Sequence, residues 1–409
     1  MRRSTLKSQF MRKGALGWAP LKPEFLPGNR IDLLETGSDY FPALCQAIDG
    51  AQHEIYLETY IFENDNTGRC VAGALSRAAQ RGVAVRVLVD GFGARDFATT
   101  LMPELIQCGI EVLIYRPELT HFNFRRHRLR RLHRKVAVVD GRVAFVGGIN
   151  VIDDMHTPGQ TPPRYDYAVR VQGPLLEPIH ESSRRVWELV TWANFKRRFR
   201  VNRTVPLLTE RRGDVRAAFV IRDNLRHRRD IEEAYLDAIA TARQEIVIAN
   251  AYFLPGRRFR RAITAAARRG VTVTVLLQGR VEYALLHHAT QALYGNLFGA
   301  GIRIFEYHLS FLHAKVAVVD AEWATVGSSN IDPFSLMLAR EANLVARDAA
   351  FAGELRTSLQ KAMTSGAHEI DCGEWQQAPL PQRIMRWLAY GLVRLLIGVS
   401  GYGGRDYRE

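Results

Sequence analysis

Two stretches of this sequence repeat one pattern of polar residues, and their residue types suit the chemistry of phosphate esters. Leu132 to Asn150 reads LHRKVAVVDGRVAFVGGIN, and Leu312 to Asn330 reads LHAKVAVVDAEWATVGSSN. Both contain H-x-K-x-x-x-x-D, with Gly seven residues and Asn ten residues beyond the Asp. One copy alone could be a hairpin with an exposed His and Lys. Two copies with matching Gly and Asn positions predict one active site built from two halves.

Two imidazoles that face one another can transfer the phosphoryl group of a diester. A neutral imidazole attacks phosphorus, and a protonated one donates to the departing oxygen. The candidate catalytic residues are the two triplets His133, Lys135 and Asp140, and His313, Lys315 and Asp320. We expect the lysines to neutralise the non-bridging phosphate oxygens. The expected neutral donors to the phosphate are Asn150, Asn330 and Ser328.

Two acidic residues are candidates for orienting the imidazoles, because an attacking histidine usually has a carboxylate behind its other ring nitrogen. Asp166, in RYDYAVRV, lies 33 residues after His133, and Glu341, in REANLV, lies 28 residues after His313. Each begins an apolar, strand-like run at equivalent points of the two repeats. The alternative is a solvated acid at the end of each strand.

A metal site is the other chemistry that clustered His and Asp residues can support. A Lys two residues from each His, on the same face of its strand, would repel a dication. The sequence also has no H-E-x-x-H motif and no cysteine cluster. We therefore expect no metal and no other cofactor.

The elements that must position these residues are repeated as well. Ala78 to Gly91 (AAQRGVAVRVLVDG) matches Ala266 to Gly279 (AARRGVTVTVLLQG). Each copy reads as alternating strands and helices before the motif hairpin, with Gly82 and Gly270 where helices end. We predict an α/β fold, in which tandem duplicated α/β/α sandwich domains form one shared active-site cleft.

The chain divides into five segments by composition and repeat. They are a basic N-terminal segment (1–28), a first domain with motif 133–150 (29–193), a basic linker (194–213), a second domain with motif 313–330 (214–378) and an amphipathic C-terminal segment (379–409). The first copy also carries a basic insert, 120–131, which the second copy lacks. We leave three roles open for this insert, namely a lid, a headgroup clamp or a solvated loop.

The C-terminal segment has the pattern of an amphipathic helix. At about 100° per residue, its polar residues fall on one side and apolar residues cover most of the rest. The polar residues are Arg383, Arg386, Tyr390 and Arg394. The pattern indicates a helix that lies in a bilayer interface with its arginines reaching the headgroups, or else a terminal helix packed on the core.

The composition limits the partners and the location. Lys and Arg number 56 against 42 Asp and Glu, and the net charge of +14 favours an anionic partner, either nucleic acid or an acidic membrane. The four cysteines are scattered, which predicts neither a disulfide framework nor a thiolate zinc site. The sequence shows neither a signal peptide nor an apolar run of transmembrane length. We expect the protein on the cytoplasmic side.

The paired motifs, with IANAYFLPG, VGSSNIDPFS and DYAVRVQGP, resemble the bacterial cardiolipin synthases of the phospholipase D superfamily over nearly the whole chain. Length and the lack of N-terminal membrane spans make the chain most similar to the B-type branch. The resemblance implies phospholipase D-type domains that transfer a phosphatidyl group between two phosphatidylglycerols, giving cardiolipin and glycerol. It implies His133 as the nucleophile, which forms a phosphohistidine, and His313 as the acid and base. It supports Glu341 more closely than Asp166, and it leaves open that Asp140 and Asp320 are structural residues that close turns and hold loops and do not touch the substrate.

The expected partners are therefore phosphatidylglycerol and an anionic membrane surface, with the protein peripheral on the cell membrane and the oligomeric state left open. A phospholipase D-type hydrolase is the first alternative, because acceptor choice depends on cleft shape and water exclusion. A nuclease of the same superfamily is the second. Few aromatic residues accompany the basic patches, and the C-terminal helix has no purpose on DNA, so nucleic acid is disfavoured. A non-catalytic scaffold would carry degenerate motifs, whereas both are intact.

Overall fold

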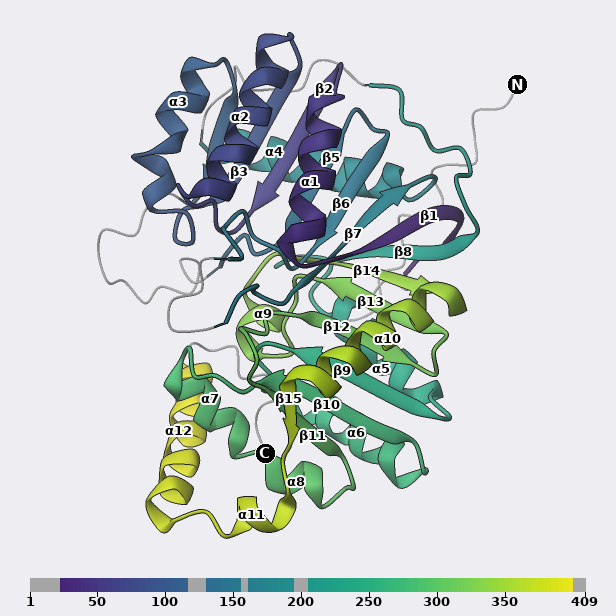
Figure 1. Cartoon of the computed structure of the whole chain (residues 1–409), viewed down its shortest axis with the longest axis vertical. Coiled ribbons are helices and arrows are strands. Elements are labelled where there is room, and N and C mark those ends of the chain that lie inside the picture. The colour runs from purple at the N-terminus through teal and green to yellow at the C-terminus, as the bar shows by residue number, and fades with distance from the viewer. Residues whose placement is uncertain (1–22, 117–129, 156–160, 195–204, 400–409) are drawn as a thin grey trace.

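The molecule consists of two similar α/β halves that share one sheet (Figure 1). The computed structural model describes residues 23–116, 130–155, 161–194 and 205–399. Most of the predicted N-terminal segment and basic insert, and half of the predicted linker, therefore lie outside the described residues, as does the end of the C-terminal segment. Each half carries one motif, as the duplication predicted.

The first half follows the predicted alternation of strands and helices. Its described elements are β1 (Leu26–Glu35), α1 (Thr36–Asp49), β2 (Glu54–Thr59), α2 (Asn66–Gln80), β3 (Ala84–Asp90), η1 (Asp96–Ala98), α3 (Leu101–Gln107), β4 (Glu111–Tyr115), β5 (Lys135–Val139), β6 (Val143–Gly147), β7 (Tyr167–Gln172) and α4 (Leu176–Ala193).

The second half repeats this order, with one additional short helix after the motif hairpin and further elements at its end. Its described elements are β8 (Val215–Arg222), α5 (Asp230–Thr241), β9 (Glu245–Asn250), α6 (Arg257–Arg268), β10 (Thr272–Gln278), α7 (Ala284–Gln291), α8 (Tyr294–Phe298), β11 (Arg303–Tyr307), β12 (Lys315–Val319), β13 (Trp323–Gly327), α9 (Pro333–Met337), β14 (Glu341–Arg347), α10 (Ala349–Gly366), β15 (Ala367–Glu369), α11 (Cys372–Gln376) and α12 (Leu380–Val399).

The strands of both halves form one 15-stranded sheet in the order β15-β11-β10-β9-β12-β13-β14-β8-β1-β7-β6-β5-β2-β3-β4. The halves meet where β1 pairs antiparallel with β8. Asn29, which is wholly buried, connects three elements there. Its Nδ2 donates to Val215 O at 3.2 Å, and the Leu175 N–H donates to its Oδ1 at 2.8 Å. The predicted α/β fold class is confirmed, and the two sheets are continuous with each other.

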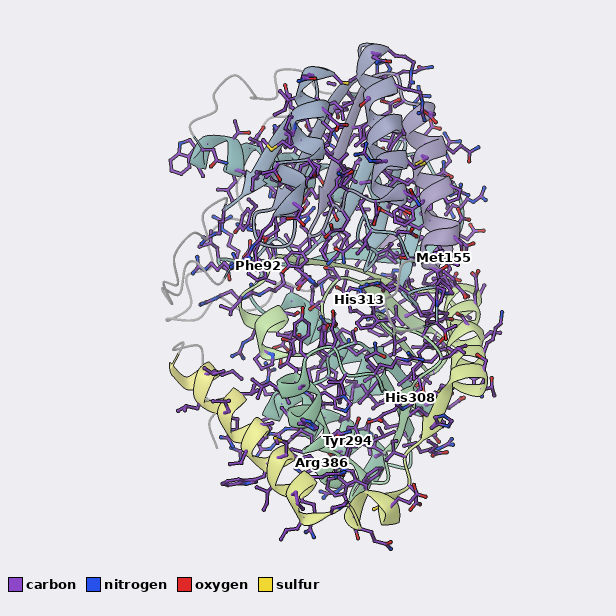
Figure 2. The ribbon with its side chains drawn as sticks, turned by 60° about the vertical axis from the view of Figure 1, so that its left-hand side comes forward. Phe92, Met155, Tyr294, His308, His313 and Arg386 are labelled. Carbon is purple, nitrogen blue, oxygen red and sulfur yellow. The ribbon has the colours of Figure 1, made fainter. Side chains whose placement is uncertain are left out.

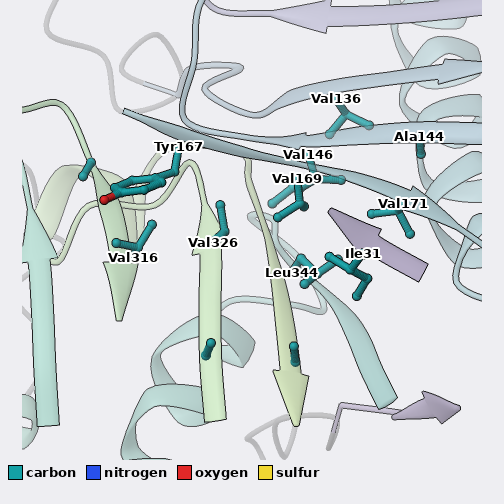
Figure 3. Packing of buried hydrophobic residues seen from close by; sticks show 14 of the residues in the cluster. Ile31, Val136, Ala144, Val146, Tyr167, Val169, Val171, Val316, Val326 and Leu344 are labelled. Carbon is teal, nitrogen blue, oxygen red and sulfur yellow. The ribbon is translucent and has the colours of Figure 1, made fainter. Parts of the chain in front are cut away.

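Helices cover both faces of this sheet, as an α/β sandwich requires. One hydrophobic cluster lies beneath α4 and α10 and runs through both halves, including Val146 and Val169 of the first and Val316 and Leu344 of the second (Figure 3). A second cluster lies beneath α1, α2 and α3, and a third lies beneath α5, α6 and α8. The shared cluster fixes the motif strands of the two halves against each other.

Local backbone rules explain why the motif strands turn and the helices stop where they do. Asp140 and Gly141 have φ of 52° and 58°, as a type I′ hairpin turn between β5 and β6 requires. Gly82, at φ 86°, follows α2, and the Gly82 and Val83 N–H groups donate to Ala79 O and Ala78 O. This Schellman cap ends the helix as the sequence predicted, and Gly270 repeats it after α6.

Helix α12 packs along α7 at the lower left of Figure 1. Among the residues described, no helix combines the length and apolarity needed to cross a bilayer.

Candidate active site

The two motif histidines lie at the starts of β5 and β12, and each is held by backbone of the opposite half. The His133 N–H donates to Arg340 O at 2.9 Å, and the His313 N–H donates to Tyr165 O at 2.8 Å. Short parallel bridges join Leu132 with Arg340 and Leu312 with Tyr165. Figure 2 shows His313 between the two halves. Main-chain hydrogen bonds therefore build the site across the middle of the molecule.

The carboxylates behind the imidazoles are exchanged between the halves. His133 Nδ1 lies 3.0 and 3.1 Å from the two carboxylate oxygens of Glu341. His313 Nδ1 lies 2.6 Å from Asp166 Oδ2. Glu341 is the first residue of β14 and Asp166 directly precedes β7, but each serves the histidine of the other repeat. The sequence distances between each histidine and the acid that follows it do not reveal this exchange. The order of the strands in the sheet decides which strand ends meet.

Both motif lysines are buried beside their histidines. Lys135 Nζ donates to His133 O at 2.7 Å. Lys315 Nζ donates to His313 O and lies 3.4 Å from Asp166 Oδ2. Burial and the neighbouring Lys315 lower the pKa of Lys135 to about 7. Two cations so close together provide strong positive potential for a phosphate monoanion.

Burial also controls the protonation of the imidazoles. Burial, with Lys315 next in size, lowers the pKa of His313 to about 3. Burial lowers the pKa of His133 too, although Glu341 opposes it. For Asp166, burial favours the neutral acid, but Lys315 and His313 outweigh it and hold the pKa below its usual value. Both rings are therefore neutral at pH 7. With Nδ1–H donated to a carboxylate, each presents the lone pair of Nε2.

Asp140 and Asp320 lie at the far ends of β5 and β12, five-residue strands that separate them from the histidines. The Asp140 carboxylate accepts the N–H groups of residues 52, 53 and 54 at 2.8–2.9 Å. The Asp320 carboxylate accepts those of residues 243, 244 and 245 at 2.7–3.0 Å. These carboxylates hold the starts of β2 and β9. They are not brought to the imidazoles, so we do not retain them as catalytic residues.

The three predicted phosphate donors differ in their surroundings. Asn150 Oδ1 accepts the Ile61 N–H at 3.2 Å, and Asn330 is buried with no hydrogen-bond partner for its Oδ1 in the described part of the chain. Ser328 instead donates to Glu341 Oε2 at 2.5 Å. Its hydroxyl therefore fixes the acid behind His133 and does not point at a phosphate. Gly148 takes the equivalent place in the first motif, where a Cβ would lie 2.4 Å from Asp166 Oδ1.

Two further residues border the histidines and were not predicted. The Tyr60 ring lies 4.9 Å from the His133 ring, and Lys135 Nζ lies 5.5 Å from the centre of Tyr60. The Arg164 guanidinium lies 4.8 Å from the Phe311 ring, which stacks on His313. Arg164 Nε is buried and has no hydrogen-bond partner among the described residues. The sequence signal that could have identified Arg164 is a basic residue shortly before each carboxylate, in RYD and RE.

The His and Asp residues of the site do not assemble a metal centre. Across the described ranges, no group of three or more His, Cys, Asp or Glu side chains is arranged to hold a metal ion.

Comparison with known proteins gives a consistent family. The family model described as "Cardiolipin synthase, PLD-like domain" matches residues 44–157 and 235–363. Cardiolipin synthase B of Escherichia coli K12 is 39% identical over 373 residues, which cover 89% of this chain and 86% of that protein. Cardiolipin synthase A of Proteus mirabilis is 30% identical over 383 residues, covering 90% and 76%.

A solved structure shares the fold at much lower sequence identity. Phosphatidylserine synthase of Haemophilus influenzae superposes with a TM-score of 0.68 at 13% identity, covering 91% of this chain and 96% of that one. At this identity the likeness concerns the fold alone.

Proposed function

This chain belongs to the cardiolipin synthase family of phospholipase D-like proteins, and we propose that it moves a phosphatidyl group from one phosphatidylglycerol to the hydroxyl of another, releasing glycerol. It is a phosphatidyltransferase of the phospholipase D type. The observation that carries the proposed mechanism is the symmetric pair of histidines, His313 buried and His133 half-buried, each with a carboxylate at Nδ1 and a lysine beside it.

In the first step, His133 Nε2 attacks phosphorus of the donor lipid. The P–O bond to glycerol breaks, and a phosphatidyl group remains on His133. His313 supplies the proton that the departing alkoxide needs. Its pKa is low in the protein alone, because burial and Lys315 oppose its charge. The negative charge of the bound phosphodiester favours the protonated form, so the ring takes up a proton from water before the P–O bond breaks. Lys135 and Lys315 neutralise the non-bridging oxygens throughout.

In the second step, the headgroup hydroxyl of another phosphatidylglycerol replaces the departed glycerol. His313, now neutral, removes its proton, and the alkoxide oxygen attacks phosphorus as the P–N bond to His133 breaks. Cardiolipin forms, the His133 ring is free again, and His313 returns its proton to water as the product leaves. No metal is needed, because the two ammonium groups supply the neutralising charge that metal ions supply in many phosphoryl enzymes. Thorough chelation should leave the rate unchanged, and rescue of a lost rate by a divalent ion would contradict this step.

The proposed setting is the cytoplasmic face of the cell membrane, with the protein bound peripherally to phosphatidylglycerol-containing bilayers. The net charge of +14 supports an anionic surface.

The deciding experiment incubates the protein with phosphatidylglycerol vesicles and analyses the lipids by mass spectrometry. Cardiolipin together with glycerol supports the synthase. Phosphatidic acid alone would show that water is the acceptor, as in a phospholipase D-type hydrolase. If neither lipid product forms and added DNA is cut, the protein is a nuclease of this superfamily.

The roles of the two histidines are separated by trapping the covalent lipid adduct. His133→Ala should abolish turnover and the adduct. His313→Ala should abolish turnover but still trap some adduct, because His133 remains able to attack. An adduct that persists in His133→Ala and vanishes in His313→Ala would reverse the assignment.

A further inference from the structure

Helix α12 turns an apolar surface away from the protein. Trp387, Leu395 and Leu388 are 72%, 61% and 53% exposed. Around the helix, at about 100° per residue, the outward half of the circumference from Trp387 to Leu396 contains no charged residue. The large exposed side chains of this half, called here the α12 face, are Leu380, Ile384, Met385, Trp387, Leu388, Leu392, Leu395 and Leu396. Monomeric soluble proteins rarely expose so continuous an apolar surface.

The other side of α12 is the one that contacts the protein, and it includes polar residues. Ala389, Val393 and Ile397 are buried in a cluster with Leu254 and α7. Arg386 Nε donates to Gln291 Oε1 at 3.2 Å, and Arg260 Nη1 donates to the Tyr390 hydroxyl at 3.4 Å. The sequence pattern placed Arg386 and Tyr390 toward the surroundings of the protein. The structure corrects this, because these hydrogen bonds hold them against α6 and α7 and leave the larger apolar side outward.

The α12 face lies close to the second half of the active site. Leu254 packs beneath α12, and its N–H donates to Ile331 O at 2.8 Å. Ile331 directly follows the motif residue Asn330. In Figure 2, α12 forms the lower left margin of the molecule, below His313.

Exposed apolar residues also lie in the loops that follow β3 and β10. Phe92 follows β3, and Val281 and Tyr283 follow β10 just before α7. The end of β3 adjoins the first motif, since the Leu132 N–H donates to Asp90 Oδ2 at 2.8 Å. The loop after β3 and the residues beneath α12 are therefore each connected by a hydrogen bond to a residue at the edge of one of the two motifs.

We propose that the α12 face lies in the interface of an anionic phospholipid bilayer and holds the active site against the surface that contains its substrate. The identity of that substrate rests on the proposed function. The helix has 20 residues, or about 30 Å, which is enough to lie along a bilayer. Exposed Arg383 at the margin of the face and the chain's net charge of +14 complement acidic headgroups. Trp387 lies at the edge of the face, and indole rings favour the interface.

The test measures vesicle binding of the full chain. Co-flotation with phosphatidylglycerol–phosphatidylcholine vesicles is compared for the unmodified protein and for Leu388→Glu/Leu395→Glu. The variant should bind about 100-fold or more weakly, since two leucines no longer enter the apolar region. The control variant is Leu189→Glu/Trp192→Glu on α4, where the side chains are 41% and 76% exposed. It changes the net charge by the same amount and should bind the vesicles normally. Unchanged thermal unfolding shows that each variant is folded.

Activity on two forms of substrate separates this proposal from the proposed function. The α12 variant should make cardiolipin from monomeric short-chain phosphatidylglycerol at the normal rate and lose activity only on vesicles. If the unmodified protein makes no cardiolipin from either form, the proposed function fails, while the loss of vesicle binding still supports the role of α12. Equal vesicle binding by the variant and the unmodified protein would overturn that role. So would a lipid-free dimer of the unmodified protein that the α12 variant dissociates, because the face would then bind a second copy.

Discussion

Each motif histidine takes its carboxylate from the opposite half, and the two carboxylates are held differently. Glu341 reaches His133 Nδ1 with both oxygens and is fixed from behind by the Ser328 hydroxyl. One carboxylate oxygen of Asp166 contacts His313 Nδ1, and the other accepts the N–H of the neighbouring Tyr167. The shorter acid, Asp166, lies against Gly148, and the longer acid, Glu341, contacts Ser328. The Gly-Gly pair of the first motif therefore accompanies an aspartate, and the Ser-Ser pair of the second accompanies a glutamate.

The first prediction concerns Asp166, which we propose positions the His313 ring and fixes its tautomer. Asp166→Asn should lower kcat by about 10²- to 10⁴-fold, because an amide no longer holds the proton at Nδ1. KM for phosphatidylglycerol should change little. The phosphohistidine adduct should accumulate in rapid-quench samples, since His313 no longer removes the acceptor's proton. A rise in KM without accumulation would indicate a substrate-binding role instead.

The second prediction concerns pH. Burial and Lys315 lower the pKa of Lys135 to about 7, so the ammonium is charged below this pH and neutral above it. An anionic phosphodiester needs the charged form, so kcat/KM should fall about tenfold per pH unit above neutrality. Lys135→Arg should remove this basic limb, since a guanidinium stays charged. A basic limb at the same pH in the Lys135→Arg profile would assign the titration to another group.

At the scale of the elements, the hairpins that carry the motifs are equal in length but not in strain. In the first, Asp140 and Gly141 both adopt left-handed conformations. In the second, Asp320 is followed by Ala321, whose φ of 49° places a Cβ in a region that favours glycine. The carboxylates of both turns anchor the starts of β2 and β9, which explains why the turns keep an Asp that lies far from the histidines.

The third prediction follows from this difference. Ala321→Gly should raise the free energy of unfolding by about 0.5–1 kcal/mol, because it relieves the left-handed alanine. The matched change Gly141→Ala should lower it by more, since a Cβ there would also meet Leu207 Cδ2 at 2.5 Å. Denaturant unfolding measures both, and kcat should be unaffected. A destabilised Ala321→Gly protein would show that the turn is not strained.

Much of the structure at the scale of the elements could be predicted from the sequence, because turns and helix ends depend on residues that are close together in the sequence. The motif hairpins and the helix ends at Gly82 and Gly270 each depend on a few adjacent residues and were predicted correctly. The opening strands β1 and β8 were not predicted as elements, although they join the halves. The exchange of Asp166 and Glu341 could not be predicted either, because it depends on how the two repeats meet. The outward side of α12 depends likewise on Gln291 and Arg260, which lie far away in the sequence.

At the scale of the whole molecule, the continuous sheet makes the two halves one structural unit. The β1–β8 pair joins the halves at the centre of the sheet, and the shared hydrophobic cluster under α4 and α10 extends across it. Each histidine also depends on a backbone carbonyl and a carboxylate of the opposite half. The active site and the β1–β8 junction should therefore lose their structure in the same unfolding transition.

The fourth prediction tests this dependence at Asn29. Asn29→Ala leaves the buried Leu175 N–H and Val215 carbonyl without their side-chain partner, and it should lower the free energy of unfolding by about 2–4 kcal/mol. Activity and structure should be lost at the same temperature when both are followed through a thermal melt. Arg30→Ala, at the exposed next residue, should cost less than about 0.5 kcal/mol. Loss of activity well before unfolding would show that the halves separate first.

The exchanged carboxylates have a consequence for how such a chain arose. A single repeat has a histidine whose acid belongs to another repeat, so one copy alone cannot complete the site. Two identical copies related by a two-fold axis can, because each would lend its acid to the other. A chain with this exchange is what the fusion of two such copies would give. Within one chain the two copies of each residue can differ, as they do in the pairs Asp166 and Glu341, and Gly148 and Ser328.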